Sequence, residues 1–173
     1  MANLVTALAT NIHREIPGEA AAELVARPRS PLWLNLAVGE LLALDEDDFI
    51  GVDPTADPVT ELAQLVIRTV RELPDGIQQL VDRIIDRLER RFGVATTSAV
   101  LGALSVSRSG LTPADLAAVA GTDDLTVAGI RRGFAGMVVS RGSGQRLGFA
   151  HGLVRETAAA RFALGDQKRR IHR

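Results

Sequence analysis

The sequence predicts a mainly α-helical protein, in which a helical bundle subdomain is followed by a domain of shorter helices with a small β-hairpin. Apolar residues recur at helical spacing in the segments between residues 19 and 92, and near residue 138 the period becomes alternating. The charge changes along the chain as well. Residues 1–92 hold 9 basic and 16 acidic side chains, whereas residues 93–173 hold 11 and 5. We therefore expect two domains, at 1–92 and 93–165, and a linker helix that starts within 166–173.

The first domain is expected to contain four helices. Helix formers at 19–26 lie between proline-containing turns, and a second helix begins with Ser30 as the N-cap and Pro31 at the first helical position. That helix has almost no polar face, so it should be buried. After an acidic loop, two amphipathic helices end at Leu73 and Phe92. Only Pro74-Asp75-Gly76 separates them, which predicts antiparallel packing.

The second domain is expected to be built from short elements. A helix at 95–106 precedes a second helix with Thr112 as the N-cap and Pro113 at the first position, and a third follows at 125–137. Alternating residues on both sides of a glycine-rich turn predict a hairpin, and residues 151–164 return to helical spacing. This order is that of a winged-helix domain, which indicates a shape more than a function.

Several classes of function are excluded by what the sequence lacks. It contains no cysteine, and its three histidines are too scattered for a metal site. No apolar run approaches the length of a membrane span and no basic leader precedes one, so we expect a cytoplasmic protein with no membrane partner. No Gly-x-x-x-x-Gly-Lys-Ser/Thr sequence occurs, so the Walker motifs of an NTPase are missing. We therefore do not expect an enzyme.

Four segments, in this order, resemble the helical and winged-helix region of the STAND class of signalling NTPases. The resemblance is to NACHT-like bacterial members that continue into tetratricopeptide repeats, although Ser30 stands where that class usually has asparagine. The segments are Ser30-Pro31-Leu32-Trp33-Leu34 with Glu40-Leu41-Leu42, the stretch 73–93, the stretch 101–116, and Phe149-Ala150-His151 with Arg155-Glu156 and Arg161-Phe162.

The resemblance implies a regulatory lid and nucleotide-state sensor. In that class the proline packs against adenine and the histidine approaches the phosphates of ADP, which implies Pro31 and His151 as nucleotide contacts. ADP or ATP with Mg²⁺ would be bound only in an intact parent, which would be a slow ATPase. The expected partners are a P-loop domain, in cis or in trans, and further copies in a homo-oligomer. We expect the chain to be a piece of such a parent.

Two other readings remain open. A DNA-binding winged helix would use Arg131 and Arg132 on the third helix and Arg141 and Arg146 in the hairpin to contact phosphates. The third helix has few polar side chains that could read bases, so binding would be non-specific. A nucleotide-independent interaction scaffold would need no ligand. Without the resemblance, Pro31 is an ordinary first helical residue and His151 an ordinary residue at a helix start.

Overall fold

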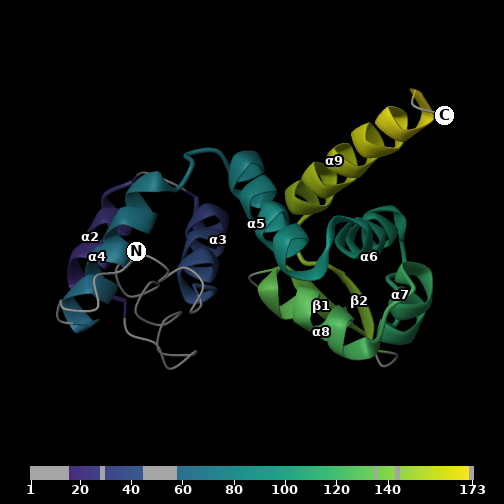
Figure 1. Ribbon diagram of the computed structural model, residues 1–173, viewed down its shortest axis with the longest axis horizontal. Coiled ribbons are helices and arrows are strands. Elements are labelled where there is room, and N and C mark those ends of the chain that lie inside the picture. The colour runs from purple at the N-terminus through teal and green to yellow at the C-terminus, as the bar shows by residue number, and fades with distance from the viewer. Residues whose placement is uncertain (1–15, 28–29, 45–57, 135, 143–144, 172–173) are drawn as a thin grey trace. The chain divides into compact units, whose positions relative to one another are not determined.

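The computed structural model describes residues 16–27, 30–44, 58–134, 136–142 and 145–171 (Figure 1). Within these ranges it contains eight α-helices and one two-stranded antiparallel sheet. The prediction of a mainly helical fold with a small β-hairpin is therefore confirmed. Residue contacts divide the chain into two compact units, Met1–Leu80 and Val81–Arg173. The predicted acidic loop lies almost entirely outside the described residues.

Three complete helices lie in the described part of the first unit. They are α2 (Gly18–Ala26), α3 (Pro31–Leu42) and α4 (Pro58–Glu72), and α4 packs against both of the others. α3 has the nearly continuous apolar surface that its sequence predicts. The core of this unit draws on all three helices and on two leucines that follow them: Ala20, Leu24, Trp33, Leu34, Leu36, Ala37, Val38, Leu41, Val66, Ile67, Val70, Leu73 and Leu80.

Arg27, directly after α2, and Trp33, in the first turn of α3, hold the turn that follows α4. Arg27 donates to the carbonyl of Leu73 at 2.9 Å and to that of Arg71 at 3.1 Å, and the indole Nε1 of Trp33 donates to the carbonyl of Pro74 at 2.9 Å. Carbonyls at a helix C-terminus have no donor within their own helix. Arg27 and Trp33 supply those donors, so the end of α4 is fixed to the C-terminus of α2 and to the first turn of α3.

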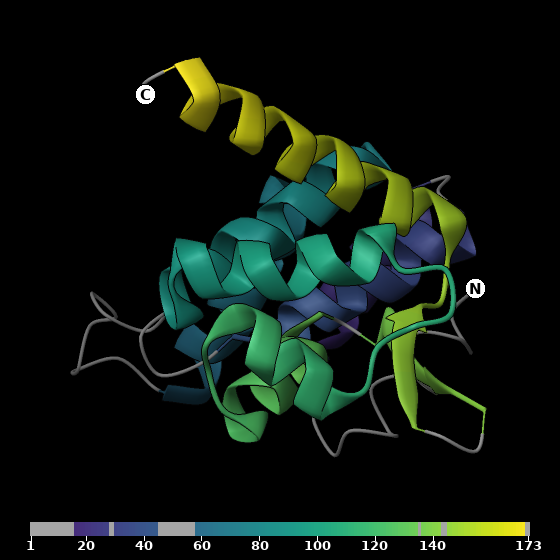
Figure 2. The same cartoon turned by 90° about the vertical axis from the view of Figure 1, so that its right-hand side faces the viewer.

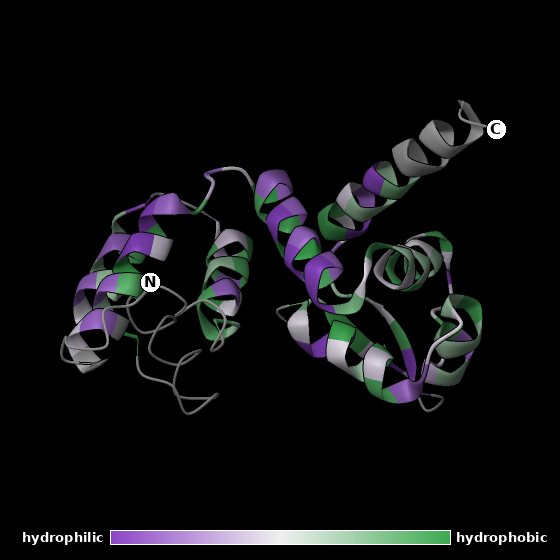
Figure 3. Cartoon of the chain, in the orientation of Figure 1, coloured by the Kyte–Doolittle hydropathy of each residue, from purple (hydrophilic) through white to green (hydrophobic). Residues whose placement is uncertain are grey.

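Helix α5 (Ile77–Phe92) contains the boundary between the units, and most of it belongs to the second. The prediction assigned all of α5 to a first domain that ends at residue 92. The contacts explain the difference. Arg87 donates to the carbonyl of Gly133 at 2.8 Å, and the buried hydroxyl of Thr97 donates to the carbonyl of Leu88 at 3.2 Å. Figure 3 shows that α5 carries many more polar residues than α6, which is mostly apolar.

Helices α6 (Val94–Val106), α7 (Pro113–Ala120) and α8 (Asp124–Gly133) follow in the second unit. The predicted cap of α7 is present, because Thr112 and Asp115 exchange backbone and side-chain hydrogen bonds at 3.1 Å. These hydrogen bonds hold the pKa of Asp115 below its ordinary value. α8 ends before the predicted residue 137, but the residues beyond it, Phe134 and Met137, are still buried.

Strands β1 (Val138–Arg141) and β2 (Arg146–Phe149) form the predicted hairpin, with Val138 opposite Phe149 and Arg141 opposite Arg146. A further backbone pairing extends this sheet and was absent from the sequence prediction. Leu111, in the connection between α6 and α7, exchanges two hydrogen bonds with Leu147 of β2, at 3.1 and 2.7 Å. The connection between two helices is therefore bound to the edge of the hairpin.

Helix α9 (Gly152–Ile171) packs across α6 (Figure 2). Its buried residues include Val154, Thr157 and Ala158. The sequence predicted a helix that ended at residue 164 and a separate linker helix from 166, whereas α9 continues without a break to Ile171. Among the described helices, none combines the length and the apolar character that crossing a bilayer requires.

Candidate functional site

His151 lies between β2 and α9, at the point where the hairpin leads into the last helix. Its backbone position is fixed on both sides. The amide of Ala150 donates to the carbonyl of Met137 at 2.8 Å, and the amide of Arg155 donates to the carbonyl of His151 at 3.2 Å. The imidazole itself is exposed and makes no hydrogen bond or ion pair with the described residues. A fixed backbone thus presents a side chain that is available to a ligand.

The start of α9 has the chemistry of an anion-binding position. The first amides of a helix lack acceptors within it, and the helix dipole adds positive potential there. No acidic residue occurs in the first turn of α9 to offset that potential. An imidazole next to these amides adds one more donor. The residues present therefore fit a phosphate group, which is the part of a nucleotide that the predicted role of His151 requires.

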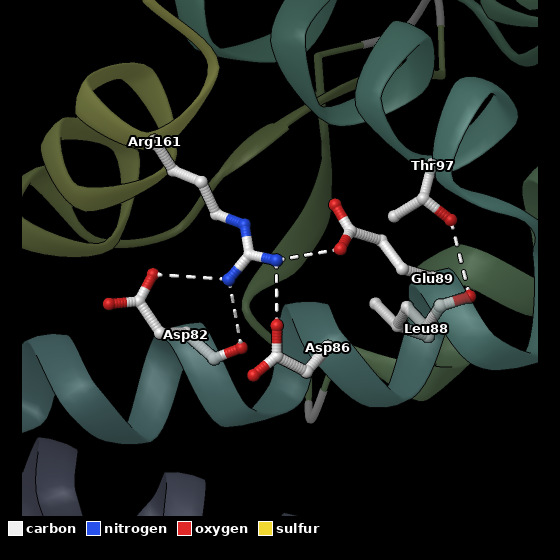
Figure 4. Close-up of polar contacts among 6 residues, drawn as sticks. All are labelled: Asp82, Asp86, Leu88, Glu89, Thr97 and Arg161. Atoms are coloured by element: carbon white, nitrogen blue, oxygen red, sulfur yellow. Dashed lines mark hydrogen bonds and ion pairs between the residues drawn. The ribbon is translucent and has the colours of Figure 1, made fainter. Parts of the chain in front are cut away.

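Arg161 binds α9 to α5 through three acidic residues (Figure 4). One guanidinium nitrogen, Nη2, contacts the carboxylates of Asp86 at 2.7 Å and Glu89 at 2.6 Å. The other, Nη1, donates to the backbone carbonyl of Asp82 at 3.3 Å and lies 3.5 Å from its carboxylate. Burial acts to lower the pKa of Arg161, but the hydrogen bond to Asp86 and the charge of Glu89 outweigh it, so the pKa lies above its ordinary value.

This cluster fixes the helix that begins next to His151, and it is not among the sites predicted from the sequence. A signal was present, because Asp82, Asp86 and Glu89 recur at intervals of four and three residues, on one face of α5. Nothing in the sequence pairs that face with a residue more than 70 positions away. The carboxylates of Asp82 and Asp86 are about half exposed, so Glu89, only 15 % exposed, should contribute most.

We expect Arg161→Met to lower the unfolding free energy of the second unit by about 1–2 kcal/mol, because methionine keeps the apolar stem but leaves three carboxylates without their cation. Chemical denaturation followed by circular dichroism measures the change. Arg155→Met is the matched control, since Arg155 lies on the same helix, is exposed and has no side-chain partner among the described residues. Equal effects of the two substitutions would show that the cluster contributes nothing.

Pro31 occupies the first position of α3 in the first unit, and its side chain is exposed. The predicted N-cap is present, because the hydroxyl of Ser30 accepts a hydrogen bond from the amide of Trp33 at 3.2 Å. Pro31 thus has the ordinary role of a first helical residue and also a free face. It belongs to a different compact unit from His151.

The four candidate anion-binding arginines fall into two pairs. Arg131 and Arg132 are exposed on α8 and have no side-chain partner among the described residues. Arg141 and Arg146 face one another across the hairpin, but both are engaged with backbone carbonyls. Arg141 donates to Phe149 at 2.6 Å, and Arg146 donates to Gly110 at 3.2 Å. Only the pair on α8 is therefore free of contacts within the described chain.

The N-terminal half of α8 does not suit a nucleic acid. A recognition helix contacts base edges with its first residues, close to the phosphates on both sides of the groove. In α8 that end carries Asp124 and the exposed Leu125, and it is preceded by Asp123, which caps the helix by accepting from the amide of Thr126 at 2.7 Å. The two carboxylates would repel a phosphate backbone.

Within the described ranges, no group of three or more histidine, aspartate or glutamate side chains is arranged to hold a metal ion. Comparisons of the chain with protein-family models, with curated proteins and with solved structures found no match.

Proposed function

We propose that the chain is the lid and nucleotide-state sensor of a STAND-like, NACHT-like signalling NTPase, with a winged-helix domain as its second part. The observation that carries the proposal is His151, an exposed imidazole without a partner among the described residues, at the start of α9. The sensor role requires a donor that can reach a phosphate, and this position supplies one.

The arrangement of the second unit supports the winged-helix assignment. Its elements follow the order helix, helix, helix and hairpin in α6, α7, α8, β1 and β2. In a winged helix the segment between the first two helices also pairs with the hairpin. The bridge between Leu111 and Leu147 provides that pairing, and it joins the second strand of the hairpin. The assignment therefore has support from a feature that played no part in the prediction.

In this proposal the chain supplies contacts and leaves catalysis to a P-loop domain. Bound nucleotide would supply an adenine ring and a phosphate anion. The exposed ring of Pro31 is suited to pack against the former, and the imidazole of His151 to donate to the latter. Each contact would restrain the compact unit to which its residue belongs. Exchange of the nucleotide would release that restraint and permit assembly.

We expect His151→Ala to weaken ADP binding about tenfold or more in a complex of the chain with its P-loop domain. The loss of one hydrogen bond to a charged group, about 1.5–3 kcal/mol, accounts for that factor. The measurement is the ADP retained per complex after gel filtration, followed by titration calorimetry. Glu156→Ala, an exposed substitution on the same helix, is the matched control. Unchanged retention in His151→Ala would contradict the sensor role.

The isolated chain provides a second control. It lacks a phosphate-binding loop, so we expect no ATP hydrolysis and no calorimetric signal with ADP or ATP. Micromolar binding of ADP or ATP to the isolated chain would contradict the proposal that a P-loop domain is needed to hold the nucleotide. A scaffold, in contrast, would bind its partner equally well with and without nucleotide, which pull-down in the presence of ADP, ATP or neither would detect.

A further inference from the structure

One face of α8 carries a stripe of four exposed residues around a half-buried alanine, and the proposed function does not use it. Successive residues of a helix turn by about 100°, so Asp124, Leu125, Ala128, Arg131 and Arg132 lie within an arc of about 120°. The buried residues of the same helix, Val127 and Ile130, lie outside this arc. We call these five residues the α8 stripe.

Most of the α8 stripe has no side-chain partner among the residues that the structure describes. The side chain of Leu125 is 79 % exposed, the largest such value among the described large apolar residues. Asp124, Arg131 and Arg132 are exposed and make no side-chain hydrogen bond or ion pair with the described residues. Arg141, Arg146 and Arg161 of the same unit are engaged, whereas Arg155 on α9 is exposed without a side-chain partner among the described residues, like the pair on α8. The stripe therefore gathers an apolar side chain and free charges of both signs on one helix.

The order of charged and apolar residues along the stripe makes it complementary to a second, antiparallel copy of the same stripe. A carboxylate lies at the N-terminal end, Leu125 and Ala128 lie in the middle, and two arginines lie at the C-terminal end. If a second α8 is laid antiparallel across the first with the two Ala128 residues in contact, position 124 faces 132 and position 125 faces 131. Each carboxylate then meets an arginine, and each leucine packs against an arginine stem.

We propose that the α8 stripe is a surface for symmetric self-association with a second copy of this chain. A twofold axis near Ala128 makes the same residues serve on both partners, as an isologous interface requires. Alanine at the axis lets the two helices approach to about 8–10 Å. A nucleic acid satisfies only the arginine end and is repelled by Asp123 and Asp124.

The size of the stripe sets the strength of the association. α8 has ten residues and is about 15 Å long, so it buries less than the roughly 1,200 Å² of a stable interface. The dimer is therefore weak, with a dissociation constant on the order of 0.1 mM. Because exposed ion pairs are screened by salt, the association weakens as ionic strength rises.

The test uses the full chain and two charge-reversal variants, with sedimentation equilibrium from about 10 µM to about 1 mM to span the expected constant. Asp124→Lys places only cations at both ends of the stripe, and Arg131→Glu with Arg132→Glu places only anions there. We expect each variant alone to associate at least tenfold more weakly than the wild type. An equal mixture of the two should recover wild-type association, because lysine then faces glutamate and aspartate faces arginine.

Every outcome of this experiment is informative. A wild-type chain that stays monomeric at about 1 mM in low salt overturns the proposal. So do single variants that associate like the wild type, and a mixture that fails to recover association. Salt-dependent binding to a duplex oligonucleotide by the monomeric wild type, lost in the double arginine variant, would assign the stripe to nucleic acid instead. Unchanged circular dichroism of the variants shows that they are folded.

Discussion

Trp33→Ala should lower the unfolding free energy of the first unit by about 3–5 kcal/mol, the usual cost of removing a large buried aromatic side chain. Trp33 is 1 % exposed, so the cavity lies inside the core. The substitution also removes the donor to the carbonyl of Pro74, and it removes the ring beneath the guanidinium of Arg27, whose central carbon lies 5.8 Å from the ring centroid. The loss of three contributions makes this the largest effect that we expect in the first unit.

Trp33→Phe separates the packing from the hydrogen bond. Phenylalanine keeps most of the apolar area but cannot donate to Pro74, so we expect a loss of only about 1–2 kcal/mol. Trp33 is the only tryptophan of the chain, and its fluorescence therefore follows the unfolding of the first unit in the wild type. The variants are followed by circular dichroism and by hydrogen exchange of α4 amides. A loss below about 1 kcal/mol for Trp33→Ala would contradict the assigned role of this side chain.

The helices of both units could be predicted because their signals are local. Ser30 and Thr112 each cap the helix whose start they predicted, and the apolar spacing of α4 and α5 gave their positions. The allocation of α5 to a unit could not be predicted in this way. It depends on contacts of Arg87 and Leu88 with residues that lie 46 and 9 positions further along the chain.

The candidate site could be predicted only in part, for a similar reason. A resemblance of local segments selected His151, and the structure places it exposed at a helix start, although its role stays a prediction. In the Arg161 cluster, Arg161 and Glu89 lie 72 positions apart in the sequence. In the Leu111 bridge, Leu111 and Leu147 lie 36 positions apart. Such pairings follow from tertiary packing, which leaves no spacing pattern in the sequence. The free state of Arg131 and Arg132 is likewise a property of what surrounds them.

The bridge between Leu111 and Leu147 depends on glycine at position 110. Gly110 has a φ of +77°, a conformation that other residues rarely adopt, and a Cβ atom there would lie 2.6 Å from the carbonyl oxygen of Leu147. Because that oxygen accepts the hydrogen bond from the amide of Leu111, the backbone has to separate to make room. Alanine at this position therefore opposes the pairing that extends the hairpin.

Gly110→Ala should lower the unfolding free energy of the second unit by about 2–5 kcal/mol, which combines backbone strain with weakening of two hydrogen bonds. Gly136→Ala is the matched control, because Gly136 has a similar φ of +72° but open space around its Cα atom. That variant should lose only the strain, about 1–2 kcal/mol. Denaturation followed by circular dichroism gives both values, and hydrogen exchange of the Leu111 and Leu147 amides locates the damage. If the two variants lose the same free energy with the Leu111 amide still protected, the bridge is not a determinant of the fold. A winged-helix arrangement would then have to be supported by the helices alone.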